Sequence, residues 1–267
     1  MSDVARLAAH LDGMGRVLLG YSGGVDSTLL AVVGARALGP ERFLAVLGVS
    51  ASVPEEAGRR AAGLADRFSI PFLQITTHEL LDPRYAENPV DRCYFCKTEL
   101  WDRLGAIAVQ RGFDTIIDGS HADDAGDHRP GARAASERAI RSPLAELGWR
   151  KADIRRAARE LDLPVWDAPA APCLASRIRY GLEVTPGRLL QVERGEAWLR
   201  SLGVTGDLRV RHHGDTARIE VEPRWFATLD AEWSAVEREF QSLGFAQVVR
   251  DARGYRRGSL LAIVEPA

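Results

Sequence analysis

The chain has 267 residues, and its 35 Lys and Arg against 37 Asp and Glu leave a formal net charge of −2. This balance argues against a broad nucleic-acid-binding surface, which is usually strongly basic. There is no signal-peptide pattern and no apolar run long enough to cross a bilayer, so the cytoplasm is the expected location. The length allows a sizeable core and two domains.

A glycine turn near the N-terminus is the first element that suggests chemistry. It reads Ser22-Gly23-Gly24-Val25-Asp26-Ser27 and lies between the apolar runs Val17–Leu19 and Thr28–Val33. This order predicts a strand, a tight turn and a helix N-terminus, where backbone N–H groups and the helix dipole attract an anion. The aspartate suits an anion site if a metal ion accompanies the anion or if the carboxylate organises the loop. The Gly-Lys-Ser/Thr ending of a Walker A loop is missing.

Strands alternate with helices through the first part of the chain. The predicted strands are Val17–Tyr21, Phe43–Val49, Phe72–Ile75 and Thr115–Asp118, and the predicted helices are Ser27–Leu38, Pro54–Phe68, Val90–Arg111 and Lys151–Leu161. Such alternation predicts an α/β fold with a parallel sheet and helices on both faces. Ligands then bind beyond the carboxyl ends of the strands, where the glycine turn and the Asp118-Gly119-Ser120 turn both belong.

A long irregular stretch, Asp123–Arg141, carries four arginines, at positions 129, 133, 138 and 141. Loops of this length in a compact domain are usually functional or disordered. Two interpretations stay open for it. One is a solvated basic loop, and the other is a flap that meets phosphate or carboxylate groups.

The pattern changes near Tyr180–Pro186, which predicts domains at 1–180 and 181–267. The second domain is expected to be a small α+β unit around a Gly214-Asp215 turn. Its predicted elements are the helices Pro186–Leu202 and Pro223–Leu243 and the strands Leu208–His212, Ala217–Val221 and Leu260–Val264.

Three cysteines occur, an odd number that favours chemistry or metal binding over a disulfide framework. Cys93 and Cys96 are three residues apart at a predicted helix N-terminus, which lowers thiol pKa values and allows chelation or redox pairing. Cys173 is close to Ser176 and Arg177, a hydroxyl and a guanidinium that favour a thiolate. A closed zinc site would need a fourth ligand. Four histidines could supply it: His121, His128, His212 and His213.

Seven strings together resemble the LarE family over nearly the whole chain. They are SGGVDS, DRCYFCK, DGSHADD, RPGARAA, SPLAELGWRKADIR, PCLASR and LRVRHHGDTARIEV. The first resembles the PP-loop of ATP pyrophosphatases, which adenylate a substrate and release pyrophosphate. The resemblance implies an adenine nucleotide alpha hydrolase-like fold and an ATP-dependent sulfur transferase. Its substrate would be pyridinium-3,5-biscarboxylic acid mononucleotide, and its product would serve the nickel-pincer cofactor of lactate racemase.

Two sulfur sources occur in this family. One kind of member sacrifices a single cysteine, which ends as dehydroalanine, and the other holds a [4Fe-4S] cluster on three cysteines and passes on a sulfide. The chain matches the three-cysteine pattern, so the resemblance implies Cys93, Cys96 and Cys173 as cluster ligands. The resemblance also implies ATP and Mg²⁺ as cofactors, and an external sulfide or sulfur donor as a partner. Sacrifice of Cys173 stays the alternative. Relatives form hexamers, which implies a homo-oligomer.

The resemblance also implies roles at the nucleotide end of the site. The pyrophosphate would be held by Ser22, Gly23, Gly24, Asp26 and Ser27. Lys151 matches a lysine that contacts phosphate, although a solvated lysine at a helix start is an equal interpretation. Asp124 is expected either to bind Mg²⁺ or to support its loop.

Arginines are implied at the substrate end. Arg209 and Arg211 alternate along a predicted strand, so both face one side, where they suit phosphate or carboxylate groups or form a solvated face. The family uses arginines here for substrate. Glu220 is expected to pair with them or to bind metal, and Tyr94 is expected to stack on the pyridinium ring.

Three rival functions stay open. Another PP-loop enzyme could amidate its substrate with ammonia, as in NAD or GMP synthesis, but amidation needs no thiols. A tRNA thiolase also uses Cys-x-x-Cys, but the near-neutral charge and the lack of an RNA-binding module argue against it. A nucleotide-binding regulatory protein would have lost catalysis.

Overall fold

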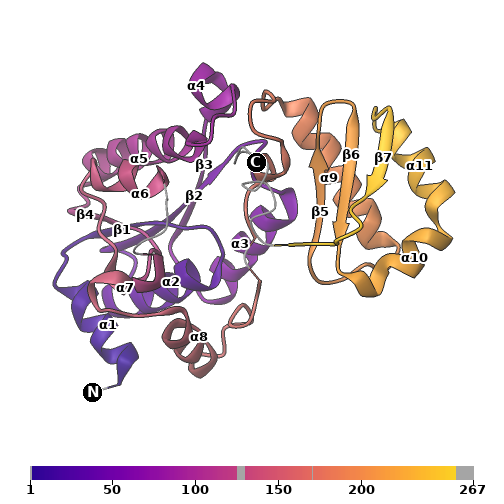
Figure 1. The fold of residues 1–267 in the computed structure, drawn as a ribbon. Helices are drawn as coiled ribbons and strands as arrows, with labels where there is room; N and C mark the ends of the chain where they lie inside the picture. Colours follow the sequence, from indigo (N-terminus) through magenta and orange to yellow (C-terminus); the bar gives the residue numbers. More distant parts are fainter. Residues whose placement is uncertain (1, 125–129, 170, 257–267) are drawn as a thin grey trace. The chain divides into compact units, whose positions relative to one another are not determined.

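The computed structural model describes residues 2–124, 130–169 and 171–256. The chain divides into two compact units, shown in Figure 1. Unit 1 comprises Met1–Glu79 and Asp91–Ala171, and unit 2 comprises Leu80–Val90 and Pro172–Ala267. These units are groups of residues that pack mainly among themselves. The division into domains at 1–180 and 181–267 is a separate statement and stays a prediction. No helix in the described part of the chain is both long enough and apolar enough to cross a membrane.

Unit 1 contains a four-stranded sheet and most of the helices. Its elements are α1 (Asp3–Asp12), β1 (Val17–Gly20), α2 (Val25–Leu38), β2 (Phe43–Val49), α3 (Glu55–Arg67), β3 (Phe72–Thr76), α5 (Arg92–Arg111), β4 (Thr115–Ile117), the 3₁₀ turn η2 (Ala122–Asp124), α6 (Pro130–Ser136), α7 (Pro143–Glu146) and α8 (Lys151–Glu160). The strand order is β3-β2-β1-β4, and all neighbouring strands are parallel. This arrangement confirms the predicted parallel α/β sheet.

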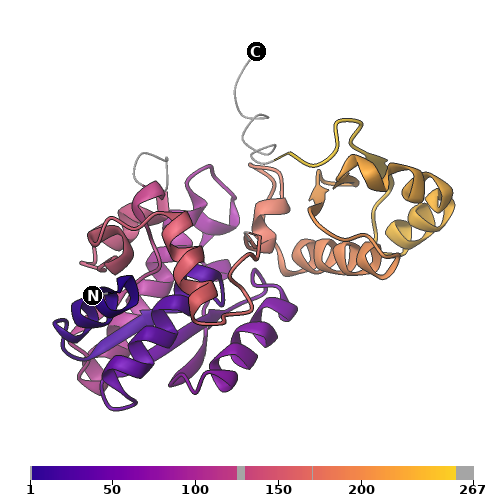
Figure 2. The same ribbon diagram turned by 90° about the horizontal axis from the view of Figure 1, so that it is seen from below.

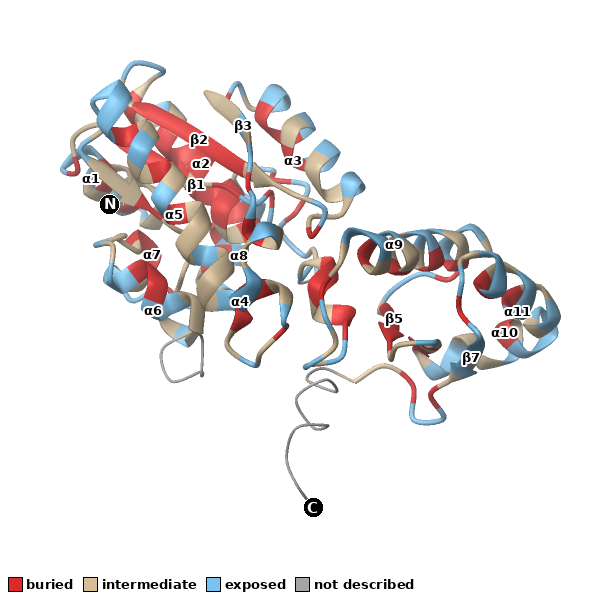
Figure 3. Cartoon of the chain, turned by 90° about the horizontal axis from the view of Figure 1, so that it is seen from above, coloured by how far each residue is buried: buried red, intermediate tan, exposed pale blue. Residues whose placement is uncertain are grey.

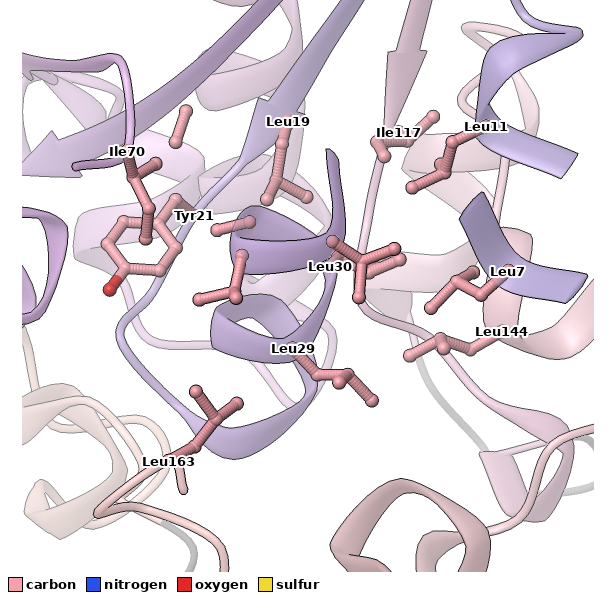
Figure 4. Close-up of a cluster of buried hydrophobic side chains, with 14 of the residues drawn as sticks. Leu7, Leu11, Leu19, Tyr21, Leu29, Leu30, Ile70, Ile117, Leu144 and Leu163 are labelled. Carbon is pink, nitrogen blue, oxygen red and sulfur yellow. The ribbon is translucent and has the colours of Figure 1, made fainter. Parts of the chain in front are cut away.

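Helices cover both faces of this sheet, as Figures 1 and 2 show together. Alternate residues of β1 enter different cores: Leu19 joins the cluster with α1, α2 and α8, and Leu18 joins the cluster with α5. Figure 4 shows the first of these clusters, in which Leu29 and Leu30 of α2 lie among side chains from the strands and α1. Because both faces are covered, the strands need apolar residues at successive positions, as the sequence has.

The central helix α2 is buried on nearly all sides, and Figure 3 shows it and β2 mostly in the colour of buried residues. Gly34 allows this burial, because a Cβ there would lie only 2.3 Å from the ring of Phe43. The helix begins directly after the glycine turn that follows β1. Its packing therefore holds that turn at the carboxyl edge of the sheet.

Unit 2 is built on a three-stranded sheet with helices against it. Its elements are α4 (Pro83–Ala86), the 3₁₀ turn η3 (Leu174–Arg177), α9 (Pro186–Ser201), β5 (Leu208–His212), β6 (Thr216–Val221), the 3₁₀ turn η4 (Pro223–Trp225), α10 (Phe226–Ala231), α11 (Trp233–Ser242) and β7 (Gln247–Arg250); the 3₁₀ turn η1 (Glu79–Leu81) begins at the last residue of unit 1 before this insertion. β5 and β6 are antiparallel, whereas β6 and β7 are parallel. The expected α+β character is therefore present.

Three elements differ from the sequence prediction. The stretch Asp123–Arg141 contains α6, because Ala134 and Ala135 bury an apolar face against α5 among the arginines. The single helix expected over Pro223–Leu243 is interrupted at Glu232. The Glu232 N–H donates to the Thr228 carbonyl at the end of α10, and the Glu232 carbonyl accepts from the Val236 N–H at the start of α11. Strand β7 was not predicted. The strand expected at Leu260–Val264 and the arginine at position 129 lie outside the described residues.

Candidate active site

The glycine turn between β1 and α2 is shaped to receive an anion. Gly23 has a φ of +71°, and a Cβ there would lie 2.7 Å from the Cβ of Ala61, so only glycine fits. Gly24 caps α2 without a side-chain hydrogen bond. The first N–H groups of α2 are thus not covered by a capping side chain, which leaves them available to a ligand.

Two serines hold this turn in shape through a small hydrogen-bond network. The Ser27 hydroxyl lies 3.0 Å from the Ser22 hydroxyl, accepts from the Ser22 N–H at 3.2 Å and donates to the Gly24 carbonyl at 3.2 Å. The Gly24 N–H is 3.4 Å from the Ser22 hydroxyl oxygen. The loop is therefore held in shape by its own hydrogen bonds, which is the arrangement that electrostatic catalysis requires.

Asp26 and Lys151 form an ion pair beside the turn. The Lys151 Nζ donates to both carboxylate oxygens of Asp26 at 2.7 Å, which joins α2 to the start of α8. The backbone N–H of Lys151 donates to Asp123 Oδ2 at 2.8 Å. Both the backbone and the side-chain ammonium group of Lys151 are thus held near the turn. Asp123, which fixes the start of α8, had no signal in the sequence beyond its place in the DGSHADD string.

The loop after β4 closes the other side of the turn. A Cβ at Gly119 would lie 3.3 Å from the Asp26 Cβ and from the Ser27 nitrogen, so the two loops meet as predicted for this edge. Asp124 accepts from the His121 N–H at 3.1 Å and therefore supports its own loop. A part in Mg²⁺ binding stays a prediction for Asp124.

The Cys-x-x-Cys pair lies in unit 1, on the first turn of α5. Cys93 is exposed and Cys96 is half-buried. Between them, Tyr94 donates from its hydroxyl to Glu137 at 2.6 Å, and the Arg133 guanidinium lies 4.0 Å from its ring centroid. One face of the Tyr94 ring is therefore occupied by Arg133, and stacking on a substrate ring stays a prediction for the other.

Cys173 lies in unit 2, and its carbonyl is the centre of a tight turn. It accepts from the Ser176 hydroxyl at 2.7 Å and from Arg177 Nη1 at 3.0 Å. Arg177 also donates to the Pro172 carbonyl at 2.6 Å and pairs with Glu196 at 3.0 Å. Ser176 and Arg177 therefore hold the backbone that carries the thiol. Glu196 was missed by the sequence, because a lone glutamate on a helix carries no signal.

A group of buried arginines lies on the same unit. Arg211 donates to Glu220 at 2.9 Å and to the Ser176 carbonyl at 2.9 Å. Arg209 is 7% exposed, and among the described residues it makes no hydrogen bond to a carboxylate. Burial, together with the nearby Arg177 and Arg211, lowers the pKa of Arg209, although Glu196 and Tyr255 partly offset this. The solvated-face interpretation is therefore wrong, since both strand arginines are buried.

The charges of this group do not balance. Arg177 pairs with Glu196 and Arg211 pairs with Glu220, which leaves the guanidinium of Arg209 as the one without a paired carboxylate among the described residues. A buried surplus cation is costly unless an anion joins it. The arginine group therefore has the positive charge and the N–H donors that a phosphate or carboxylate would need.

His212 is a core residue, since both its ring nitrogens are used within the unit. Its Nε2 lies 2.9 Å from Gln191 Oε1, and its Nδ1 accepts from the Gly214 N–H at 3.3 Å. Among the described residues, no group of three or more His, Cys, Asp and Glu side chains is placed to hold a metal ion. The zinc alternative and the three-cysteine cluster therefore both stay predictions, and His128 lies outside the described residues.

A pH dependence of stability follows from His212. Burial lowers its pKa from 6.5 to about 4, with smaller contributions from Arg188 and His213. Between these values the unfolded chain binds a proton that the folded chain does not, so stability is complete above about pH 6.5 and falls as the pH drops. The loss from this group reaches about 3 kcal/mol. Denaturant unfolding at several pH values across this range gives the free energy of unfolding as a function of pH. This free energy should change less with pH in His212→Gln than in wild type, and an equal change in both proteins would contradict the assignment.

Comparisons with known proteins extend over nearly the whole chain. A family model described as NAD synthase matches residues 4–89, which hold the glycine turn and the first three strands. An uncharacterised protein of Synechocystis is 41% identical over 97% of this chain and 97% of its own length. The pyridinium-3,5-bisthiocarboxylic acid mononucleotide synthase of Lactiplantibacillus plantarum is 36% identical over 96% of this chain and 92% of its own. An uncharacterised protein of Methanocaldococcus jannaschii is 28% identical over 90% of this chain and 91% of its own.

Proposed function

The chain belongs to the LarE family of PP-loop enzymes, and from that premise we propose that it uses ATP to place sulfur on pyridinium-3,5-biscarboxylic acid mononucleotide. The product is the bisthiocarboxylic acid mononucleotide, the precursor of the nickel-pincer cofactor of lactate racemase. The observation that carries the proposal is the serine-organised anion site at the start of α2, with the Asp26–Lys151 pair beside it.

Adenylation is the first step. A substrate carboxylate oxygen attacks the α-phosphorus of ATP, the bond from that phosphorus to the bridging oxygen breaks, and pyrophosphate leaves. The α2 N–H groups and the hydroxyls of Ser22 and Ser27 stabilise the charge on the leaving pyrophosphate. Lys151 would exchange Asp26 for a phosphate, and Asp26 would then be free to hold Mg²⁺, which prefers carboxylate and phosphate oxygens.

Sulfur transfer is the second step. Adenylation is needed because a carboxylate oxygen is a poor leaving group, whereas AMP leaves readily. A sulfide attacks the acyl carbon, the carbon–oxygen bond to AMP breaks, and a thiocarboxylate remains. Ser176 and Arg177 hold the backbone that carries the Cys173 thiol in unit 2.

Cys93, Cys96 and Cys173 are the proposed ligands of a [4Fe-4S] cluster. Two thiols one helical turn apart on α5 fit two corners of such a cluster, and Cys173 is the remaining cysteine of the chain. When bound, the cluster would supply sulfide from its iron without a cysteine ligand. The alternative is that Cys173 gives up its own sulfur. We also propose that the protein is a homo-oligomer reloaded by sulfide or a sulfur donor.

The second step requires that the substrate is held in place. We assign substrate binding to Arg209 and Arg211, and Glu220 to the support of these arginines. Arg209 is the sharper probe, since Arg211 removal would leave Glu220 buried without its ion pair. Arg209→Met should weaken binding of the pyridinium mononucleotide roughly 10- to 150-fold, the cost of a charge-assisted hydrogen bond. Binding of ATP should be unchanged. Calorimetric titration checks both, with the exposed Arg224→Met as the matched control. Unchanged substrate affinity in Arg209→Met would remove this residue from the site.

Amidation is the second candidate function, because the NAD synthase model matches the PP-loop region. Both functions release AMP and pyrophosphate, but they differ in the attacking atom. The first test is whether the pyridinium biscarboxylate nucleotide stimulates release of AMP and pyrophosphate from Mg-ATP. Release of ADP and phosphate would contradict both functions.

A further inference from the structure

A histidine lies on the same sheet face of unit 2 as the arginine group. Successive side chains of a strand point to opposite faces, so Arg209 and Arg211 of β5 share one face and His212 has the other. The N–H of the next residue, His213, donates to the Thr216 carbonyl at 2.9 Å, which continues the antiparallel pairing of β5 with β6. His213 therefore lies on the arginine face, about 7 Å from Arg211 along the strand.

Cations surround His213 from three segments of unit 2. Arg211 precedes it on β5, and Arg218 pairs with Arg211 across β6. Arg179 lies at the end of β5, where its backbone N–H donates to the His212 carbonyl at 3.1 Å. Burial is the main cause that lowers the pKa of His213 from 6.5, and smaller contributions come from the charges of Arg218, Arg179 and Arg211. The imidazole is therefore mainly neutral at pH 7.

Negative charges near His213 are taken up by arginines. Glu220 accepts from Arg211 at 2.9 Å, and the buried Asp251 pairs with Arg218. Among the described residues, the buried Nε2 of His213 has no hydrogen-bond partner. A buried polar atom without a partner costs free energy, so a ligand that supplies an acceptor to this nitrogen is favoured.

We propose that His213 is a further substrate contact, whose Nε2 donates a hydrogen bond to the phosphate of the mononucleotide. A phosphate carries a charge of about −1.5 to −2 at pH 7 and three acceptor oxygens, so it can accept from the arginine group and from His213 together. The inference deepens the proposed function and rests on its assignment of Arg209 and Arg211 to the substrate. Every residue that it uses belongs to unit 2.

Binding of a phosphate beside His213 would be coupled to a proton. A negative charge close to the imidazole favours the protonated ring and raises its pKa. His213 would therefore take up a proton as the substrate binds. The affinity would be highest at low pH and would fall as the pH rises through the raised pKa.

Calorimetric titration with pyridinium-3,5-biscarboxylic acid mononucleotide at about pH 6 and about pH 8.5 tests this contact. His213→Met removes the donor and should weaken binding roughly 10- to 150-fold at the lower pH, the cost of a charge-assisted hydrogen bond. His213→Gln keeps a neutral donor, so it should lose less affinity there. The gap between wild type and either variant should narrow at the higher pH.

His10→Gln is the matched control, because His10 lies in unit 1 and pairs with Glu146. It should bind the mononucleotide as wild type does at both pH values. Titration of the substrate phosphate itself is common to all four proteins, so it cancels in the comparison. Wild-type affinity in His213→Met at both pH values would overturn the inference.

The second readout is the ring pKa itself, and it does not depend on which nucleotide is the substrate. Sulfate resembles phosphate in shape but does not titrate in this range, so it is added in excess to ¹⁵N-histidine-labelled wild type and followed by NMR. The pKa of one imidazole should rise by roughly 1–3 units, and its signal should be missing from both His213 variants. Pyridine-3,5-dicarboxylate, which lacks a phosphate, should not cause this rise.

Three outcomes of the NMR titration would overturn the inference. They are an absence of any response to sulfate, a responding signal that persists in the His213 variants, and a rise produced by the dicarboxylate. Failure of the mononucleotide to bind wild type would contradict the proposed function instead, and the response to sulfate would still decide on His213.

Discussion

Asp26→Ala and Ser27→Ala are each expected to lower the rate of pyrophosphate release roughly 10²- to 10³-fold, the usual effect of removing one preorganised charge-stabilising group. Ser27 supports the loop through bonds to Ser22 and Gly24, so its loss disturbs the anion site itself. Asp26 acts differently, because its removal leaves Lys151 without its carboxylate and removes the proposed Mg²⁺ ligand. Measuring pyrophosphate release with Mg-ATP and the biscarboxylate nucleotide checks both variants.

The control for this prediction is Asp102→Ala. Asp102 is also an ion-paired aspartate of unit 1, but it lies on α5 and its partner is Arg138 rather than Lys151. Pyrophosphate release should be unchanged in this variant. Full activity in Asp26→Ala together with Ser27→Ala would contradict the assignment of the glycine turn as the pyrophosphate site.

Cys93→Ala and Cys96→Ala are each expected to abolish iron binding and multiple turnover. A cluster held by three cysteine ligands would keep one iron open to external sulfide, and the loss of one ligand would remove the means of holding it. The wild type should keep its full polypeptide mass after several turnovers with sulfide. Anaerobic turnover counts, iron content and intact-protein mass check these points together.

Thr98→Ala is the control for the cysteine variants. Thr98 lies on the same helix, α5, and its hydroxyl has no hydrogen-bond partner among the described residues, so iron content and turnover should be unchanged. The sacrificial mechanism predicts a different result. The wild type would lose about 34 Da, the mass of H₂S, as the Cys173 thiol becomes an alkene. A Cys93→Ala, Cys96→Ala double variant with full activity, or dehydroalanine at Cys173, would contradict the cluster.

The sheet and the glycine turn could be predicted because their signals are local. Each strand of unit 1 is a short apolar run, and the turn Ser22–Ser27 carries its glycines and hydroxyls in one string. The alternation of Arg209 and Arg211 likewise placed both on one face of a strand, and their pairing register with β6 agrees. Burial of these arginines was left open, because a sequence does not show what covers a sheet face.

The contacts that complete the site were not predictable, since they join residues far apart in sequence. Asp26 and Lys151 are 125 residues apart. Glu196 supports Arg177 from the middle of a helix whose sequence shows only an ordinary charged residue. Insertion of Leu80–Val90 into unit 2 was missed for the same reason, because its partners come after Pro172.

The most direct measurement of the proposed function is the atom that enters the activated carboxyl group. Wild-type protein with Mg-ATP and pyridinium-3,5-biscarboxylic acid mononucleotide is offered sulfide and ammonia together under anaerobic conditions, and the nucleotide product is identified by mass spectrometry. We predict a thiocarboxylate, formed with equal amounts of AMP and pyrophosphate. A carboxamide, or consumption of ATP with no change in the nucleotide, would contradict sulfur transfer.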